Sequence, residues 1–252
     1  MKVSKESVRL LVSAPSQYAI RLARSSEEVQ SAQSLRFKVF NLELNEGLEH
    51  SYNTGLDTDP YDAVCDHLIV EHIPSGQVVG TYRLQTGPSA GRNLGYYCDQ
   101  EFDLKIFEPF RPQVVELGRA CVHRQHRNLF VLGLLWKSIG EYVRERGARY
   151  LIGCSSLTSQ DPAAGASAYT ELCRNHLVEP QWRTQPLASH ACPLEAVTEE
   201  PVSIPKLLRA YLMLGAKICG PPAVDCQFKT IDFLTMLDME TLSESTRERF
   251  LS

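Results

Sequence analysis

The chain has 252 residues, of which 43% are hydrophobic and 22% are charged. It is therefore long enough to bury a full core, and close to the upper size of one domain. A formal net charge of -4 excludes a general nucleic-acid binder, which would need a basic excess to contact phosphates. We expect an N-terminal extension over residues 1–17, which frays or adds an edge strand, and a single domain over 18–252 with loop inserts near 41–63, 87–111 and 179–203.

Eight cysteines are spread through the chain without a C-x-x-C pair, and no apolar signal sequence precedes them. This pattern favours buried, reduced thiols over a disulfide framework or a metal site. The longest apolar run is far shorter than the roughly 20 residues that span a bilayer. We therefore expect a cytoplasmic protein without a bound metal, whose contact with a membrane is at most peripheral.

The N-terminal part predicts a strand, a helix and a long loop. Residues 18–23 alternate like a short strand, and Ser25 opens a capping signal for a helix with apolar positions as far as Phe40. Arg36 lies on or beside the apolar stripe of this helix, where its guanidinium needs a carboxylate. Residues 41–62 are polar and rich in Gly and Asp, which predicts an irregular loop lining a binding site.

Next comes a predicted antiparallel hairpin, with strands at residues 65–72 and 77–84 and a tight turn at 74–76. Each strand carries one charge at an otherwise apolar place, Asp66 in the first and Arg83 in the second. Residues 87–111 follow as a loop-rich insert with several Tyr and Phe side chains. They would form either a small satellite core or the apolar wall of a ligand pocket.

The stretch from residue 113 to 142 combines a charged strand, a basic turn and a helix. Glu116 and Arg119 interrupt an apolar run, and charges buried in a sheet need partners. The basic turn over 123–128 ends in Asn128, which can cap the following helix, and Gly147 can end that helix. Because free helix amides and nearby cations both favour phosphate, the turn is a candidate anion site.

The remaining pattern predicts alternating strands and helices. The helix over 204–214 is amphipathic, and we expect Leu207, Leu208, Tyr211, Leu212 and Leu214 to serve core packing rather than membrane contact. The order of elements predicts an α/β fold with a mixed, mostly antiparallel central sheet flanked by helices on both faces. The other expected segments are a strand at 149–156, a helix at 166–176, an exposed Pro-rich excursion at 179–201 and strands at 216–219 and 231–237.

This order of elements resembles the Gcn5-related N-acetyltransferase (GNAT) fold, in which the phosphopantetheine of the acyl donor lies where the central strands splay apart. The turn from Arg124 to Leu129 lacks the glycines of the usual Q/R-x-x-G-x-G/A loop of that fold. An acyl carrier protein presents phosphopantetheine without an adenine nucleotide, so a loop without glycines would suffice for that donor.

Several motifs are similar to those of the bacterial ornithine–acyl carrier protein N-acyltransferases, over roughly residues 18–250. This family makes lyso-ornithine lipid and is related to acyl-homoserine lactone synthases and N-acyl amino acid synthases. The matching motifs are LRFKVF at 35–40, YDAVCDHL at 61–68, VGTYRL at 79–84, ELGR at 116–119, CVH at 121–123, LLW at 134–136, YLIGCSS at 150–156, LRAYL at 208–212 and GAKICGPPA at 215–223.

Acyl transfer from a thioester to an α-amine requires a neutral amine, and Glu116 is the best-placed base to take its proton. Glu116 could also be a structural partner of Arg119 or Arg36, and we name Glu116 and Arg119 as the catalytic pair. The resemblance to the synthases places the matching charges in the amine pocket, with arginines for the carboxylate of ornithine and aspartates for its distal ammonium. Because each charge buried in such a sheet needs a partner, we expect an alternating charge cluster of Arg36, Asp62, Asp66, Arg83 and Arg119. The expected substrate-binding residues are Arg36, Asp62, Asp66, Arg83 and Ser155.

The acyl donor is expected to lie beside the end of the charged strand and the basic turn. Backbone amides around residues 120–122 would meet the oxyanion, and Cys121 is expected to pack rather than to act as a nucleophile. Arg124 and Arg127 would dock the acidic carrier or its phosphate. The residues expected at the donor are Cys121, Val122, His123, Arg124 and Arg127.

The resemblance therefore implies an N-acyltransferase that moves a long, 3-hydroxylated acyl chain from acyl carrier protein to the α-amine of ornithine. We expect no tightly bound cofactor, acyl-phosphopantetheine as co-substrate, and peripheral contact with the inner membrane. Three alternatives stay open: another amine such as glycine, tyrosine or lysine; homoserine lactone formation with S-adenosylmethionine; and a non-catalytic module that binds acyl chains or the carrier. Coenzyme A also stays open as the donor.

Overall fold

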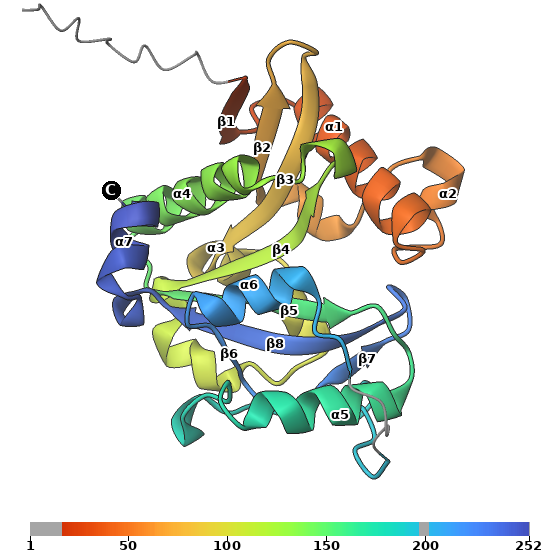
Figure 1. Ribbon diagram of the computed structural model, residues 1–252, viewed down its shortest axis with the longest axis vertical. Helices are drawn as coiled ribbons and strands as arrows, with labels where there is room; N and C mark the ends of the chain where they lie inside the picture. The colour runs from red at the N-terminus through yellow and green to blue at the C-terminus, as the bar shows by residue number, and fades with distance from the viewer. Residues whose placement is uncertain (1–16, 197–201, 252) are drawn as a thin grey trace, which may run out of the picture.

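A computed structural model describes residues 17–196 and 202–251, which form one eight-stranded sheet with helices on both faces (Figure 1). The strand order is β1-β2-β3-β4-β5-β8-β6, and β7 also pairs with β8. Among the described strands, β4 and β5 run parallel and the other neighbours antiparallel. The predicted fold class is confirmed. The expectation for the N-terminal extension falls largely outside the described residues.

The strands are β1 Tyr18–Leu22, β2 Asp66–His72, β3 Gln77–Thr86, β4 Val114–Val122, β5 Tyr150–Leu157, β6 Lys217–Ile218, β7 Ala223–Asp225 and β8 Thr230–Asp238. The helices are α1 Ser26–Phe37, α2 Ser51–Thr54, α3 Gly87–Arg92, α4 Leu129–Glu145, α5 Pro162–Cys173, α6 Lys206–Met213 and α7 Glu244–Leu251. A π-helical turn, Lys38–Glu43, extends α1, and the longer 3₁₀ segments are Pro60–Ala63, Tyr97–Gln100 and Lys105–Gln113.

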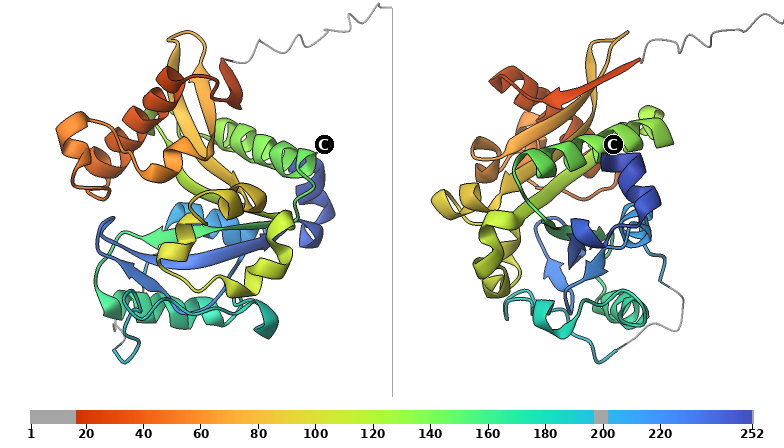
Figure 2. Two further views of the ribbon diagram at one scale, coloured as in Figure 1. Left: turned by 180° about the vertical axis from the view of Figure 1, so that it is seen from behind. Right: turned by 90° about the vertical axis from the view of Figure 1, so that its left-hand side faces the viewer.

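The predicted capping residues lie at the starts of α1 and α4. Ser25 accepts a hydrogen bond from the amide of Glu28 at the start of α1, and Asn128 accepts one from Val131 at the start of α4. Helices α4 and α6 cover the sheet face seen in Figure 1, whereas α1 and α3 cover the face seen from behind in Figure 2. We call these the α4 face and the α1 face.

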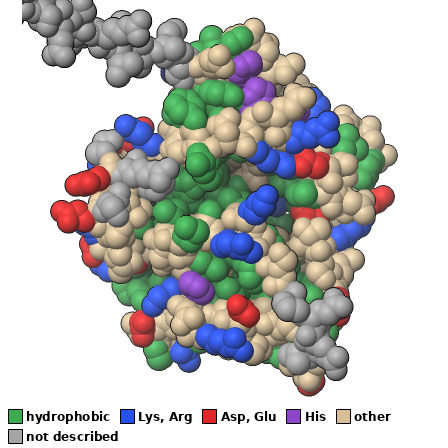
Figure 3. Space-filling view, viewed as in Figure 1, with side chains coloured by type: hydrophobic (Ala, Val, Ile, Leu, Met, Phe, Trp, Pro, Cys, Tyr) green, Lys and Arg blue, Asp and Glu red, His purple; other side chains and the backbone are tan. Residues whose placement is uncertain are grey.

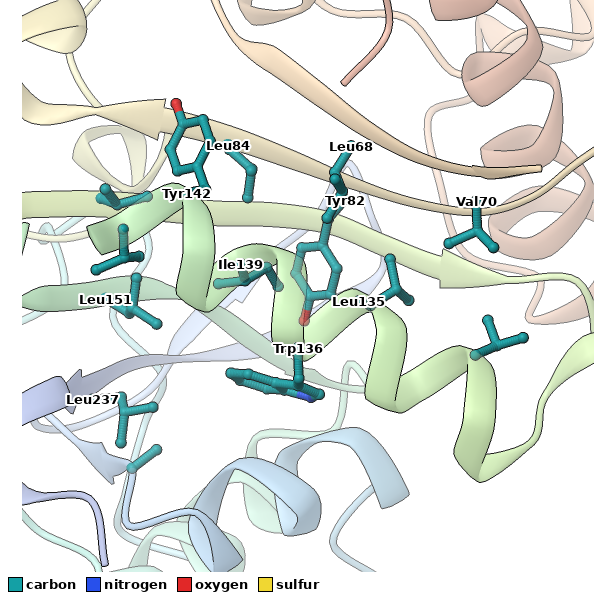
Figure 4. Close-up of a cluster of buried hydrophobic side chains, with 14 of the residues drawn as sticks. Leu68, Val70, Tyr82, Leu84, Leu135, Trp136, Ile139, Tyr142, Leu151 and Leu237 are labelled. Atoms are coloured by element: carbon teal, nitrogen blue, oxygen red, sulfur yellow. The ribbon is translucent and has the colours of Figure 1, made fainter. Parts of the chain in front are cut away.

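Alternating side chains of the strands build a separate core on each face. On the α4 face, Tyr82 of β3 packs with Leu135 and Trp136 of α4 (Figure 4). On the α1 face, Tyr96, Phe102 and Phe107 of the aromatic insert are fully buried in a second cluster. The insert over 87–111 therefore forms a satellite core, as the first of the two interpretations predicted.

Five sequence-based assignments were wrong or incomplete. The loop over 41–62 contains α2 and short helical turns, and α5 begins at Pro162 because Asp161 caps it. Strand β7 and helix α7 were not predicted. The excursion from residue 179 is partly packed, since the ring of Trp182 lies 4.8 Å from that of Phe110. Residues 197–201 of that excursion lie outside the described residues.

Strands β4 and β5 pair over three residues and then diverge. Their register joins Val114–Glu116 to Tyr150–Ile152, and no pairing follows. At the point of divergence, a Cβ on Gly153 would lie 2.3 Å from the carbonyl oxygen of Leu117. Glycine therefore permits a close approach that no other residue allows there. We call this point, at Leu117 and Gly153, the fork.

We predict that Gly153→Ala destabilises the protein by about 1–3 kcal/mol, because the new methyl group would overpack against backbone that cannot move aside cheaply. Urea denaturation followed by circular dichroism measures this change. Gly133→Ala is the matched control, since a Cβ at that position of α4 meets no atom within 4 Å. Equal stability of the Gly153→Ala variant and the wild type would contradict the role given to this glycine.

Candidate active site

Strand β4 carries a bulge that turns two charged residues to the same face. Glu116 and Arg119 are three residues apart, so a regular strand would point them to opposite faces. Four residues of β4, Gly118 to Cys121, lie opposite only three of β3, Thr81 to Arg83, and Arg119 has a φ of 52°. Glu116 and Arg119 both contact Tyr97, and so both lie on the α1 face.

Six charged side chains on the α1 face form a closed ring in which acid and base alternate. Arg36 pairs with Asp57 at 2.7 Å and with Asp62 at 2.6 Å. Arg83 pairs with Asp62 at 2.9 Å and with Asp59 at 2.6 Å. Arg119 pairs with Asp59 at 2.8 Å and with Asp57 at 3.4 Å, which closes the ring. We call Arg36, Asp57, Asp59, Asp62, Arg83 and Arg119 the charge ring.

The charge ring is buried from solvent and carries no net charge. None of its side chains is more than 9% exposed, and three cations face three anions. Burial alone would raise the pKa of Asp62, but Arg36 and Arg83 hold it well below its usual value. Arg119 and Arg83 lower the pKa of Asp59 in the same way. Asp59 and Asp62 are therefore ionised at neutral pH.

Sequence analysis found four of the six members. Arg36, Asp62, Arg83 and Arg119 lie in the ring as expected, whereas Asp57 and Asp59 were missed. The signal for them was the run of aspartates in an otherwise irregular segment, LDTDPYD.

Asp66 was wrongly assigned to this cluster. It is the first residue of β2 and points to the α4 face, where it accepts a hydrogen bond from Tyr142 at 2.7 Å and lies 3.3 Å from Arg146. The next residue, His67, points to the α1 face instead, and its Nε2 lies 3.0 Å from the carbonyl of Asp62. Strand alternation therefore separates Asp66 from the ring.

Glu116 is bound by backbone amides rather than by an arginine. Its two carboxylate oxygens accept hydrogen bonds from the amides of Tyr97 and Cys98, each at 2.8 Å. Burial raises the pKa of Glu116, although these amides act to lower it. The pKa of this carboxyl is thus closer to neutrality, as a base for an ammonium requires. Gln85, opposite Glu116 on β3, has a buried amide without a hydrogen-bond partner in the described part of the chain.

A cavity of about 320 Å³ passes through the fork. Glu116, Arg119 and Tyr97 border it on the α1 face, and Tyr82, Leu208 and Tyr211 on the α4 face. Since both faces of β4 and β5 contribute, the two sides of the cavity meet between the strands. Such a passage allows two substrates to approach from opposite faces.

The α4 side of the cavity is mostly apolar. Helix α6 covers it, and the hydroxyl groups of Tyr82 and Tyr211 share a hydrogen bond across it. Figure 3 shows apolar side chains lining a hollow on this face of the molecule. Leu208 and Leu212 of α6 pack into a core cluster, as expected from the sequence, while Leu207 is 38% exposed beside the cavity.

Two candidate residues near the fork have distinct surroundings. Ser155 borders the cavity and accepts a hydrogen bond from Thr235 at 2.8 Å. Cys121 does not border it, because its side chain packs among Leu35, Val39 and Phe40 under α1. Burial raises the pKa of Cys121 to about 12, so the thiol stays protonated.

The basic turn lies at the surface, at the start of α4. Arg127 donates to the carbonyl of Val122 at 2.8 Å and forms a two-pronged pair with Glu43. Arg124 is exposed and has no ion-pair partner among the described residues. His123 accepts a hydrogen bond from the amide of Gln125 at 3.4 Å. The turn therefore offers cations to a partner in solution rather than to the cavity.

The α1 side of the cavity also contains carboxylates that the sequence did not reveal. Glu46, Asp225 and Asp232 border it, and each is at most 7% exposed. They come from the loop after α1, from β7 and from β8, three segments far apart in the sequence. No local motif could have predicted their meeting.

Comparison of the sequence with known proteins finds a matching domain family and relatives that share one name. The family described as "Acetyltransferase (GNAT) domain" matches residues 35–137. A curated L-ornithine N(alpha)-acyltransferase of Brucella abortus is 34% identical over 244 residues, covering 89% of this chain and 85% of the relative. One of the same name from Rhodobacter capsulatus is 32% identical, covering 94% and 96%.

Solved structures share the fold at low sequence identity. The N-acyl amino acid synthase FeeM, from uncultured soil microbes, has a TM-score of 0.53 at 11% identity, covering 89% of this chain and 91% of its own. The AHL synthase LasI has a TM-score of 0.51 at 12% identity, covering 92% and 94%. These likenesses extend the GNAT-like fold over most of the described chain.

We predict that Asp62→Asn costs about 3–5 kcal/mol of stability, because it leaves Arg36 and Arg83 buried without a full counter-charge. The loss is measured by urea denaturation at pH 7. Glu108→Gln is the control, since it breaks a two-pronged pair with Arg111 that is largely solvent-exposed and should not change stability measurably. If Asp62→Asn were no more destabilising than Glu108→Gln, the ring would not be the structural tie described above.

Proposed function

This chain belongs to the family of L-ornithine N(alpha)-acyltransferases, and we propose that its cavity is where a long acyl group passes from the thioester of an acyl carrier protein to the α-amine of ornithine. The observation that carries the proposal is the passage through the fork, apolar on the α4 side and charged on the α1 side. An acyl thioester suits the first side and an amino acid suits the second.

The reaction would take place at the fork. The neutral α-amine attacks the thioester carbonyl, a carbon–nitrogen bond forms, and the carbon–sulfur bond breaks to release the carrier thiol. Glu116 accepts the proton that the amine must lose, and that proton passes to the leaving thiolate or to water. We propose that backbone amides near Ala120–Val122, beside the diverging strands, stabilise the oxyanion.

The charge ring would orient the amino acid. Arg83 and Arg119 both border the cavity, and we propose that they bind the carboxylate of ornithine. Their positions are fixed by the aspartates of the ring and by aromatic rings, since the guanidinium carbon of Arg119 lies 4.6 Å from the centre of Tyr97 and 4.2 Å from that of Phe228. A fixed carboxylate places the α-amine reproducibly.

The surface at the start of α4 supports an acidic carrier protein as donor. Arg124 and Arg127 lie there beside two unusually exposed apolar side chains, Leu129 at 76% and Phe130 at 53%. Cations around an apolar patch suit a partner with acidic and apolar groups on one helix. We propose this surface as the docking site of the carrier, and a 3-hydroxyacyl chain as its cargo.

Contact with the inner membrane would be peripheral. No helix within the described ranges is both long and apolar enough to cross a bilayer. Leu207 of α6 borders the cavity, and Met213 at the end of the same helix is 82% exposed. We propose that they touch the lipid surface when the single-chain product leaves.

We predict that the purified protein releases free thiol from 3-hydroxyacyl carrier protein only when ornithine is present. Thiol release is followed with a chromogenic reagent, and the mass of N-acylornithine is confirmed by mass spectrometry. A panel of glycine, tyrosine, lysine and S-adenosylmethionine supplies the competing amines, and acyl-coenzyme A the competing donor. If product formed only with a different amine, the assignment of ornithine as the acceptor would be wrong. If product formed only from acyl-coenzyme A, the assignment of acyl carrier protein as the donor would be wrong.

We predict that Glu116→Gln lowers kcat by about 10²–10⁴-fold, because it removes the base that takes the proton of the amine. In the wild type, kcat should rise with pH through the raised pKa of Glu116, and this dependence should be lost in the variant. The measurement is kcat with ornithine between pH 5 and 9.

The control for that prediction is Asp99→Asn. Asp99 accepts a hydrogen bond from the amide of Tyr96 at 2.7 Å, so it caps the same 3₁₀ segment as Glu116, but it does not border the cavity. Its variant should keep kcat near the wild-type value. Equal losses in the two variants would mean that Glu116 only holds that segment in place.

A further inference from the structure

Four buried carboxylates near one end of the cavity form no ion pair with a Lys or Arg of the described chain. Glu46, Asp225 and Asp232 border the cavity, and a carboxylate oxygen of Glu101 lies within 4.8 Å of one of Asp232. None of the four is more than 7% exposed. We call these four the acidic cluster.

The acidic cluster differs from the charge ring in its balance. Each aspartate of the ring lies between two arginines, so the ring offers no uncompensated negative charge to a ligand. The acidic cluster forms no ion pair, and the nearby Arg119 offsets the burial of Glu101 only in part. Burying carboxylates without a paired cation is costly. A cationic ligand group that enters the cavity would therefore be attracted to the acidic cluster rather than to Asp62.

Asp232 is the member with an unsatisfied atom. Its Oδ1 is buried and accepts no hydrogen bond from the described residues. Burial and the neighbouring carboxylates of Asp225 and Glu46 raise the pKa of Asp232 to about 6, and burial, Asp232 and Asp225 raise that of Glu101 to about 10. Glu101 and Asp232 thus share a proton at neutral pH, which a bound cation would displace.

Strand geometry gives the distance from Glu116 to this cluster. Glu116 is level with Ile152 on β5, and Asp232 is paired with Ser156, four residues further along. Ile152, Cys154 and Ser156 share one face, so the two residues are offset by roughly 13 Å along the strands at about 3.3 Å per residue. They are also offset by roughly 10 Å across the sheet, because β5 lies between β4 and β8, so their backbone positions are roughly 16 Å apart. Extended ornithine holds its two nitrogens about 6 Å apart, and a hydrogen bond of about 2.8 Å at each end brings the span to roughly 12 Å. The side chains of Glu116 and Asp232 are long enough to cover the difference.

We propose that Asp232, supported by the acidic cluster, binds the side-chain ammonium of ornithine while Glu116 faces the α-amine. This inference rests on the proposed function and adds the residues that select a diamine. The substrate then lies over β5, with its carboxylate toward the charge ring and its distal end over the paired residues Ser156 and Asp232. Selection against amino acids without a side-chain cation follows, because they would leave the buried carboxylates unpaired.

The donor set favours an ammonium over a metal ion. Glu101, Cys154 and Asp232 place one sulfur and two oxygens within 4.8 Å of one another. However, a hydrogen bond with Cys98 and burial raise the pKa of Cys154 well above its usual value. A protonated thiol is a poor metal ligand, whereas carboxylate oxygens are good acceptors for an ammonium.

The test compares ornithine with L-norvaline, which has the same carbon chain without the side-chain amine. In the wild type, kcat/KM for ornithine should exceed that for norvaline by at least about 100-fold. Asp232→Asn should reduce this ratio at least about 10-fold, through a higher KM for ornithine, and leave norvaline unchanged or improved. Asp103→Asn is the control, because that aspartate lies near Glu101 in the chain but is 44% exposed and pairs with Lys105 outside the cavity.

Other results would overturn the inference. Equal kcat/KM for ornithine and norvaline in the wild type would refute the role of Asp232 and leave the proposed acyl transfer standing. No turnover of any amine would refute the proposed function itself. An equal loss for both substrates in Asp232→Asn would indicate a structural role. A stoichiometric metal in the purified wild type, absent from Asp232→Asn, would assign the site to that metal. If Asp232→Asn does not fold, Glu46→Gln provides the same comparison.

Discussion

The charge ring is the interaction on which the site depends. Three arginines from α1, β3 and β4 meet three aspartates from one short segment, and the six charges leave no net charge behind. Buried ions are stable only when every partner is present, because a missing one leaves a desolvated charge. The ring therefore fixes the segment from Asp57 to Asp62 against the sheet, and it fixes the sheet against α1.

The bulge in β4 follows from the ring. A left-handed backbone at Arg119 costs of order 1–3 kcal/mol, and a non-glycine residue keeps it only where its surroundings hold it there. Asp57, Asp59, Tyr97 and Phe228 all hold the Arg119 side chain on the α1 face. The same bulge places Glu116 and Arg119 on one side of the strand, directly after the point where β4 diverges from β5.

Buried charge serves two purposes in this molecule. In the ring, cations and anions cancel, which gives rigidity and two well-placed arginines at the cavity. In the acidic cluster, carboxylates remain without a paired cation, which is a cost that a bound ammonium would offset. Glu116 is held by two backbone amides, and its pKa is raised by burial. A diamine with one carboxylate matches the charges that border the cavity.

The sequence by itself determined the fold class, the long helices with their caps, and most of the charge ring. These follow from local periodicity, capping residues and charges that interrupt apolar strands, all of which are visible in one segment at a time. Tertiary structure alone decided that Asp66 points away from the ring, that Asp57 and Asp59 complete it, and that Asp232 meets Glu46 and Asp225. These positions are set by the alternation of side chains along each strand, by a single bulge and by the pairing of β5 with β8. Each of these depends on contacts between residues far apart in the chain.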